Sequence, residues 1–310
     1  MQTFNQNSVP RGQNPFTAQN GLSVLDIRHD SVFKAVFTRD TPESRGALSS
    51  LLSALIGKIV SVETIIANEP PSNGMFQRNI RYDISCRTTN GKLVNIEMSL
   101  HPNADELNRL EYYVSRLFVM QDIRGSEKHY WDLKETFQIA IIARETFFQD
   151  EYLTHQFEYY DPAAAVSLKG KTRIITMELE KAVMAIEKSA VEMTGAEAWA
   201  AFFQYLTDNT KSAKIEEIMQ HEGGIAMAAE TLHGFSEEEK QYLWQMSRDK
   251  FELDNQSRMA FAKKAARQEG LKQGKLETNL ENARKMKADN MSVSQISKYT
   301  GLSEQQILDM

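Results

Sequence analysis

The sequence predicts an α/β fold that continues into a C-terminal all-helical extension. Two runs of alternating apolar and polar residues, 80–86 and 93–100, are typical of strands, because strand side chains alternate between two faces. Leucines in segment 48–56 recur at the spacing of an amphipathic helix that stops at Gly57. Beyond Glu180 the pattern is helical, so we expect the strands in the first part of the chain.

The elements around these runs follow from equally local signals. Residues 1–21 are rich in Asn, Gln and Pro without periodicity, which predicts a disordered leader. Residues 59–68 have the composition of a strand. A helix is predicted to open at Asn103, with Glu106 three residues later in a capping box, and to end near Asp122.

The register of the two alternating strands decides which side chains meet. A two-residue loop would set Asp83 opposite Met98 and place the polar face of one strand beside the apolar face of the other, which burial forbids. A three-residue loop, 89–91, with Gly91 in the left-handed conformation, aligns the polar faces. In that register Asp83 lies directly opposite Glu97.

Two opposed carboxylates predict a metal site. Like charges destabilise a strand pair unless a cation compensates them, and hard divalent cations bind clustered carboxylates. Asp83 and Glu97 are therefore candidate ligands of Mg²⁺, or of Mn²⁺ or Ca²⁺. The alternative is a solvated face on which each carboxylate pairs with Arg81, Arg87 or Lys92, and the hairpin taken alone favours this alternative.

The helix predicted to start at Asn103 carries a stripe of arginines and tyrosines. Arg109, Tyr112, Tyr113 and Arg116 fall at positions i, i+3, i+4 and i+7. One interpretation is a DNA-backbone or active-site face made of these arginines and tyrosines, on which Arg109 and Arg116 contact nucleic acid. The alternative is a half-buried face in which tyrosines pack and arginine stems lie along apolar surface. The two are balanced for Arg109, and packing is favoured for the tyrosines.

A series of different short motifs is distributed along most of the chain. They are the segments 30–37, 95–98, 137–143, 157–161, 177–181 and 268–274, with the single residues Asp83, Arg109, Tyr112, Tyr113, Gln121, Gly125, Tyr130 and Leu133. In order and spacing together they resemble the Rpn family of recombination-promoting nucleases, also described as transposases. That family is a branch of the PD-(D/E)xK nuclease superfamily.

The resemblance implies a restriction-endonuclease-like core, which is a mixed central sheet flanked by helices. It also implies that Asp83 and Glu97 ligate magnesium and that Asp30 joins through water. The implied activity is that of a Mg-dependent endodeoxyribonuclease, in which a metal-bound water hydrolyses the phosphodiester. DNA is then the expected partner, in recombination or mobile-element biology.

One position departs from the family pattern. Two residues after Glu97 the family usually has glutamine, and the superfamily lysine, whereas this chain has Ser99. A serine hydroxyl is neutral, short and a poor base. Lys34 or Lys92 would substitute if it reached the site, and Asn95 would orient water. The alternative function is a catalytically degraded relative that acts as a nucleic-acid-binding or oligomeric interaction protein.

With this resemblance, we expect five consecutive regions. They are the leader (1–21), a nuclease-like domain (22–182), a helical extension (183–262), a basic helical segment (263–290) and a small helix-turn-helix-like end (291–310).

The C-terminal part carries a basic stretch on an acidic chain. Residues 263–287 hold eight lysines and arginines against three glutamates. A basic helix can engage phosphates, so Lys263, Lys264 and Arg267 are candidate nucleic-acid contacts, although a solvated helix face explains most charge runs. The second short helix of 291–310 lacks Arg and Lys, so packing or homo-oligomer contact is at least as well supported as base reading.

Composition bounds the remaining classes of protein. The chain is 41% hydrophobic and 25% charged, and its net charge is −6. It contains no apolar run long enough to span a membrane and no secretory pattern at its N-terminus. We therefore expect a cytoplasmic protein without a membrane partner. The single cysteine, Cys86, shares the apolar strand face with Tyr82 and Ile84, which predicts an inert buried thiol. No histidine pair has zinc-like spacing, and we expect His29 to be a surface or capping residue.

Overall fold

The computed structural model describes residues 25–66, 82–100, 102, 105–123 and 125–310. The predicted leader, Arg81 and Asn103 lie outside these residues. The chain divides into two compact units after Arg248, and each is described by itself.

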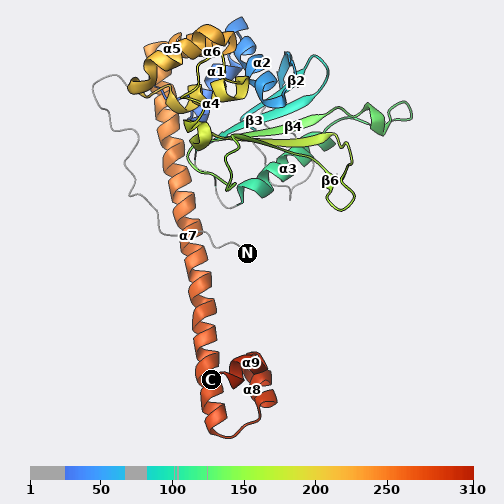
Figure 1. Cartoon of the computed structure of the whole chain (residues 1–310), viewed down its shortest axis with the longest axis vertical. Coiled ribbons are helices and arrows are strands. Elements are labelled where there is room, and N and C mark those ends of the chain that lie inside the picture. The colour runs from blue at the N-terminus through green and yellow to red at the C-terminus, as the bar shows by residue number, and fades with distance from the viewer. Residues whose placement is uncertain (1–24, 67–81, 101, 103–104, 124) are drawn as a thin grey trace. The chain divides into compact units, whose positions relative to one another are not determined.

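A mixed six-stranded sheet is the centre of the first unit (Figure 1). Its strands, in spatial order, are β1 (Val62–Ile66), β2 (Ile84–Thr88), β3 (Leu93–Ser99), β4 (Thr136–Ile142), β8 (Thr172–Glu178) and β5 (Thr154–Phe157). β3, β4 and β8 run parallel, whereas β1–β2, β2–β3 and β5–β8 are antiparallel pairs. The predicted α/β class with a mixed central sheet is confirmed.

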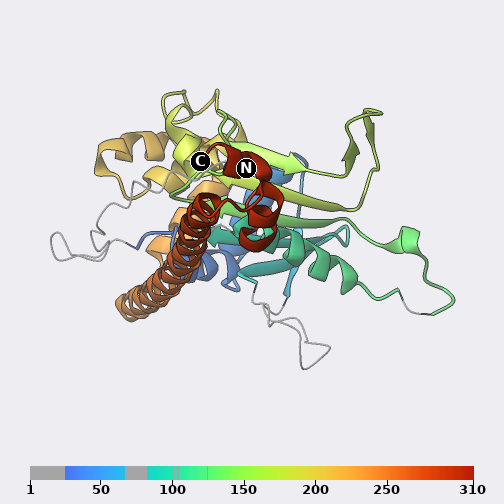
Figure 2. The ribbon, with the colours of Figure 1, turned by 90° about the horizontal axis from the view of Figure 1, so that it is seen from below.

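A separate two-stranded hairpin joins β5 to β8. Strands β6 (Tyr160–Asp161) and β7 (Val166–Ser167) pair with each other only and project from the sheet (Figure 1, Figure 2).

The β2–β3 hairpin has the predicted register. Ile84 pairs with Ile96, so the next step outward brings Asp83 opposite Glu97. The turn has three residues, and Gly91 has a φ of 77° while its N–H donates to the Thr88 carbonyl at 2.8 Å. A left-handed φ of this kind favours glycine. Local turn chemistry therefore fixes which carboxylates meet.

Both faces of the sheet are covered. On one face Val94, Ile96 and Met98 pack in the main core with helices α1 (Asp30–Thr38) and α2 (Pro42–Ile56). Helix α3 (Glu106–Val119) covers the other face, where its Leu110 packs on β4 and its Leu117 packs beside Leu93.

Two local expectations near the hairpin and α3 are wrong. Tyr82 lies on the α3 side with Leu93, not on the face of Ile84, because the strand begins only at Ile84 and the chain bends at Asp83. Helix α3 starts at Glu106 after the N-cap Asp105, so Glu106 is not the third residue of a capping box. The strand expected over 59–68 is observed as β1 within residues 59–66, and residues 67–68 lie outside the described part of the chain.

Helices complete the main core. They are α4 (Gly195–Tyr205), α5 (Ser212–His221), α6 (Gly223–His233) and the start of α7 (Glu237–Ala288). Trp199 and Phe203 of α4 are fully buried, and Phe203 lies 6.0 Å from the Phe33 ring of α1. Burial of large aromatic side chains is the main stabilising contribution here, which makes the aromatic stripe of α4 core.

The second unit contains most of α7 and two short helices, α8 (Val293–Thr300) and α9 (Glu304–Leu308). Ala283 of α7 packs with Ile296, Leu302 and Ile307 in a small apolar cluster. The expected boundary between residues 262 and 263 lies inside α7 and stays a prediction. Among the described helices none is long and apolar enough to cross a membrane.

Candidate active site

Helix α1 brings a lysine to the hairpin carboxylates. Its residues Val32, Phe33, Val36 and Phe37 are buried, so the helix presents its other side, with Asp30 and Lys34, away from the core. Lys34 Nζ lies 2.9 Å from Asp83 Oδ1 and 3.4 Å from Asp30 Oδ2. One ammonium group thus bridges two carboxylates that are far apart in the sequence.

Asp83 is fixed from two sides. Its Oδ2 accepts a hydrogen bond from the Met98 amide at 3.2 Å, while Oδ1 pairs with Lys34. The side chain is only 13% exposed. A carboxylate held at both oxygens keeps one orientation.

Glu97 is buried beneath α3, with 3% of its surface exposed. Its Oε1 accepts from Asn95 Nδ2 at 3.0 Å, and its Oε2 lies 3.2 Å from Arg109 Nη2. Burial and the negative charge of Asp83 raise the pKa of Glu97 to about 8, although Arg109 and Asn95 act in the opposite direction. Burial thus disfavours the charged form of Glu97, and the nearby charge of Asp83 adds to this.

A buried amide pair supports Glu97. Asn95 Nδ2 also donates to Gln138 Oε1 on β4 at 2.8 Å, and both amides are fully buried. Asn95 thus orients Glu97, where the sequence suggested that it would orient water. Asn95 Oδ1 and Ser85 Oγ are buried without a hydrogen-bond partner among the described residues. These atoms show that this face of the sheet is polar and enclosed, not solvated.

Arg109 lies between two buried carboxylates. Its Nη2 is 2.5 Å from Glu106 Oε1 in addition to its contact with Glu97, and its guanidinium lies 5.5 Å from the Tyr113 ring centre. The sequence analysis considered Glu106 only as a helix-capping residue and missed it as a partner of Arg109, although its i, i+3 spacing to Arg109 was a signal. Arg116 is half-buried, and its Nε has no hydrogen-bond partner in the described part of the chain.

Other candidate residues are placed differently. Ser99 is half-buried at the end of β3, and its carbonyl accepts from Ala143 N–H at 2.9 Å. Lys92 pairs with Glu135 at 2.6 Å, so it is engaged away from the carboxylate pair. Arg87 is exposed and forms no ion pair within the described residues.

The basic candidates of the C-terminal part lie on α7. Lys263, Lys264 and Arg267 are all exposed on the part of this helix that belongs to the second unit.

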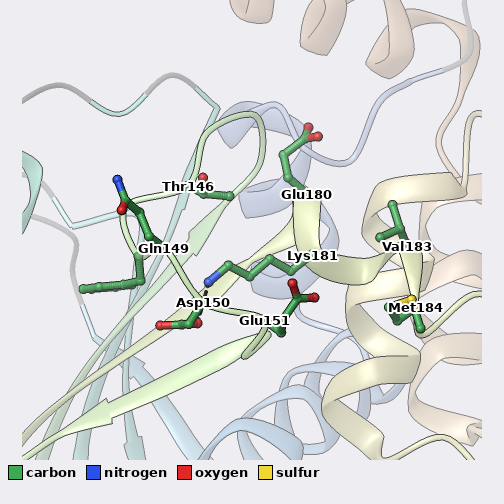
Figure 3. Close-up of a pocket in the computed structure, with 9 residues that line it drawn as sticks. Thr146, Gln149, Asp150, Glu151, Glu180, Lys181, Val183 and Met184 are labelled. Atoms are coloured by element: carbon green, nitrogen blue, oxygen red, sulfur yellow. Dashed lines mark hydrogen bonds and ion pairs between the residues drawn. The ribbon is translucent and has the colours of Figure 1, made fainter. Parts of the chain in front are cut away.

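A second polar group occupies the end of β8. Glu178 is fully buried, and its Oε2 lies 2.6 Å from Lys181 Nζ. Lys181 also pairs with Asp150 at 2.9 Å, and both residues line an open cavity of about 350 Å³ (Figure 3). Glu178 also accepts from the Phe147 amide. This network anchors the loop after β4, and all its charges have partners.

The residues around Asp83 and Glu97 suit a magnesium-type ion. Their donors are carboxylate oxygens, and the pKa of Glu97 is raised by burial and by the charge of Asp83, both of which a bound divalent cation would offset. Among the described residues no three His, Cys, Asp or Glu side chains form a full metal cage. Mg²⁺ commonly uses one or two protein carboxylates and completes its shell with water and substrate phosphate, so the pair fits this ion.

Comparison with known families decides the classification. The model of the PD-(D/E)XK nuclease family transposases matches residues 27–262. The chain belongs to this family. As a member of the PD-(D/E)XK nuclease family transposases, it combines the nuclease-type sheet with helices α4 to α6 inside the matched region. Neither the curated proteins nor the solved structures gave a significant match.

Proposed function

We propose that this chain is a metal-dependent DNA endonuclease that hydrolyses phosphodiester bonds. The observation that supports it best is the opposed pair Asp83 and Glu97, in which burial and the charge of Asp83 raise the pKa of Glu97 to about 8. The family provides the link to recombination or mobile elements, and that link is an analogy.

In this proposal Asp83 and Glu97 hold one divalent cation, Mg²⁺ first and Mn²⁺ or Ca²⁺ as alternatives, while Asp30 contributes through water. When bound, the metal would polarise the phosphoryl oxygen and lower the pKa of a bound water. Lys34 and the Met98 amide orient Asp83.

Lys34 takes the place of the side chain that Ser99 lacks. Its ammonium group lies at Asp83, and it carries the positive charge that serine does not have. A cation beside the reacting phosphate stabilises the negative charge that develops in the transition state. Ser99, two residues after Glu97 on the same face of β3, would donate a hydrogen bond at most.

DNA contacts are proposed at two places. Arg116, and Arg109 if it leaves Glu97, would contact the backbone near the site. On α7 the exposed Lys263, Lys264 and Arg267 would add electrostatic affinity that falls with salt. These contacts carry no base specificity.

Supercoiled-plasmid nicking tests the proposal. We expect the wild type to nick DNA with Mg²⁺ or Mn²⁺ and not with chelator, and Glu97→Gln to abolish nicking. Glu216→Gln, which neutralises an exposed carboxylate on α5, is the matched control and should leave nicking intact. Nicking that persists in Glu97→Gln would contradict the assignment.

The second candidate is a catalytically degraded relative that binds nucleic acid or a partner, and Ser99 is the observation that favours it. Salt-sensitive DNA binding by clean protein without cleavage under any metal would select this candidate.

Self-association through the C-terminal helices is proposed for either candidate. Leu253, Met259, Leu271 and Leu276 of α7 are exposed apolar side chains that a second copy could bury. Light scattering at several concentrations tests this, and a monomer at all of them would contradict it.

A further inference from the structure

Arg144 leaves the sheet at the edge where the candidate site lies. β3 and β4 are parallel, so both strands end at the same edge, and Ala143 N–H donates to the Ser99 carbonyl at 2.9 Å. Arg144 is the next residue along the chain. Glu97 lies only two residues before Ser99, which puts the start of the Arg144 side chain beside the end of the strand that carries Glu97.

Arg144 has no partner in the described chain. It is half-buried, yet its guanidinium makes no hydrogen bond or ion pair there. None of its nitrogens is among the fully buried unpaired atoms of the described residues, so its N–H groups remain open to solvent. Burial and the neighbouring charge of Arg28 lower the pKa of Arg144. Asp26 and Glu180 act on Arg144 electrostatically, but neither forms an ion pair with it, and a partly desolvated cation without a direct partner is costly unless it binds an anion.

The surrounding charged groups are engaged elsewhere. Arg28 donates to both oxygens of Asp26 at 2.8–2.9 Å, and to Gln204 at 3.1 Å. Glu180 lies within electrostatic reach of Arg144, but its carboxylate accepts a hydrogen bond from Gln204 Nε2 at 3.4 Å. Two arginines therefore stand close together, and only Arg144 has its donors free.

The first turn of α1 links Arg144 to the carboxylates. His29 is within electrostatic reach of Arg144, and it precedes Asp30, which pairs with Lys34. His29 occupies the N-cap position and is buried, but its side chain does not cap the helix, which corrects the expectation of a surface or capping residue. Lys34 already pairs with two carboxylates, so it is not available to bind a DNA phosphate other than the one that is cleaved.

We propose that Arg144 binds a backbone phosphate of the DNA substrate, next to the phosphate that is cleaved. Arginine presents a planar fork of donors that matches two phosphate oxygens, and such charge-assisted bonds are among the stronger ones in proteins. The inference rests on the proposed function, because it takes DNA as the substrate. Arg144 would provide a positively charged contact to the substrate at the end of β3, where the Ser99 side chain is neutral.

The test is DNA binding without cleavage. In a Glu97→Gln background with chelator, the affinity for a labelled duplex is measured by fluorescence anisotropy over a series of salt concentrations. The variants are Arg144→Gln, Arg144→Lys and, as control, Arg45→Gln, an exposed arginine of α2 that pairs with Asp40. Each binding curve is repeated with added inorganic phosphate as a competitor of the DNA backbone.

We expect Arg144→Gln to weaken binding about tenfold and to reduce the slope of log affinity against log salt by about one. Arg144→Lys should restore the slope and part of the affinity, whereas Arg45→Gln should match the parent protein. Equal affinity and slope in Arg144→Gln would overturn the inference. Millimolar inorganic phosphate should weaken duplex binding more in the parent than in Arg144→Gln, because both anions would compete for the same guanidinium.

The two proposals fail differently. If the wild type nicks plasmid but Arg144→Gln binds like the parent, only the Arg144 inference falls. If the wild type neither nicks nor binds DNA, the endonuclease proposal falls and the inference falls with it.

Discussion

Glu97 accepts hydrogen bonds from a neutral donor and from a charged donor, and these bonds explain how its carboxylate can be buried. The Asn95 amide satisfies one oxygen and Arg109 the other. A buried carboxylate without such partners would be strongly unfavourable. The same donors fix the direction in which Glu97 points, so orientation and stability have a common origin in Asn95 and Arg109.

Removing the Asn95 amide should destabilise the protein. Asn95→Ala leaves Glu97 Oε1 and Gln138 Oε1 without a buried donor, which should lower the free energy of unfolding by about 1–3 kcal/mol. Urea unfolding measures this. Asn282→Ala, at an exposed position of α7, should change it by less than about 0.5 kcal/mol. Equal effects of both substitutions would show that the buried amide pair contributes nothing.

The Cys86 thiol should be inert in the folded protein. Burial raises its pKa to about 12, so at pH 8 almost no thiolate is present, and the reactive fraction grows only as the pH approaches that value. We expect Ellman's reagent to react slowly at pH 8 and at the normal rate after unfolding in guanidinium chloride. Rapid reaction of the native protein would mean that the strand face carrying Cys86 opens readily.

At the scale of elements, the packing of α2 against α6 depends on a close approach of backbones. A Cβ at Gly224 would lie 2.1 Å from Ser50 Cβ on α2, whereas a Cβ at the preceding Gly223 would meet nothing within 4 Å. Two adjacent glycines in the first turn of α6 therefore have different roles.

These glycines provide a matched pair of substitutions. Gly224→Ala should destabilise the protein by about 1–3 kcal/mol, because α2 and α6 must move apart. Gly223→Ala should be neutral or stabilising by up to about 1 kcal/mol through helix propensity. Thermal unfolding of both variants tests this, and the reverse order of stability would contradict the observed approach of the two helices.

Local elements and the register of the β2–β3 hairpin could be predicted from the sequence, whereas contacts between elements far apart in the chain could not. The Gly91 turn and the pairing of Asp83 with Glu97 follow from alternation and turn chemistry within a short segment. Tyr82 was misplaced because alternation was extended past the start of β2. The extension was reasonable locally, and it failed because the bend at Asp83 has no sequence signal.

The long-range part of the site lay beyond sequence reasoning. Lys34 was a candidate only through its residue type, since its distance to Asp83 depends on how α1 packs on the sheet. The contact of Asn95 with Gln138 needs the parallel pairing of β3 with β4. Arg144 carried no motif at all, and its missing partner is visible only in the fold.

At the scale of the whole molecule, the two units differ in how charge is arranged. The first unit contains the buried carboxylates and the cations that surround them, whereas the second exposes basic side chains along α7. The matched family region ends at residue 262, just before Lys263. Hydrolysis and the additional electrostatic affinity for DNA are therefore proposed for separate parts of the chain.

Neutralising the basic positions of α7 tests that separation. The triple substitution Lys263→Gln, Lys264→Gln and Arg267→Gln should weaken duplex binding most at low salt and leave the rate of cleavage at saturating DNA unchanged. Anisotropy and single-turnover rates measure the two effects. A large fall in the saturated rate would place these residues in the chemical step and contradict the division.

The most direct test of the central claim is single-turnover cleavage of a labelled duplex in Mg²⁺ by the wild type, Lys34→Met, Ser99→Lys and the double variant. We predict that Lys34→Met slows cleavage by at least about a hundredfold. Adding Ser99→Lys should recover a substantial part of that loss, because it returns a lysine two residues after Glu97. Cleavage by Lys34→Met at the wild-type rate would contradict the role of Lys34. No cleavage by the wild type would contradict the endonuclease proposal itself.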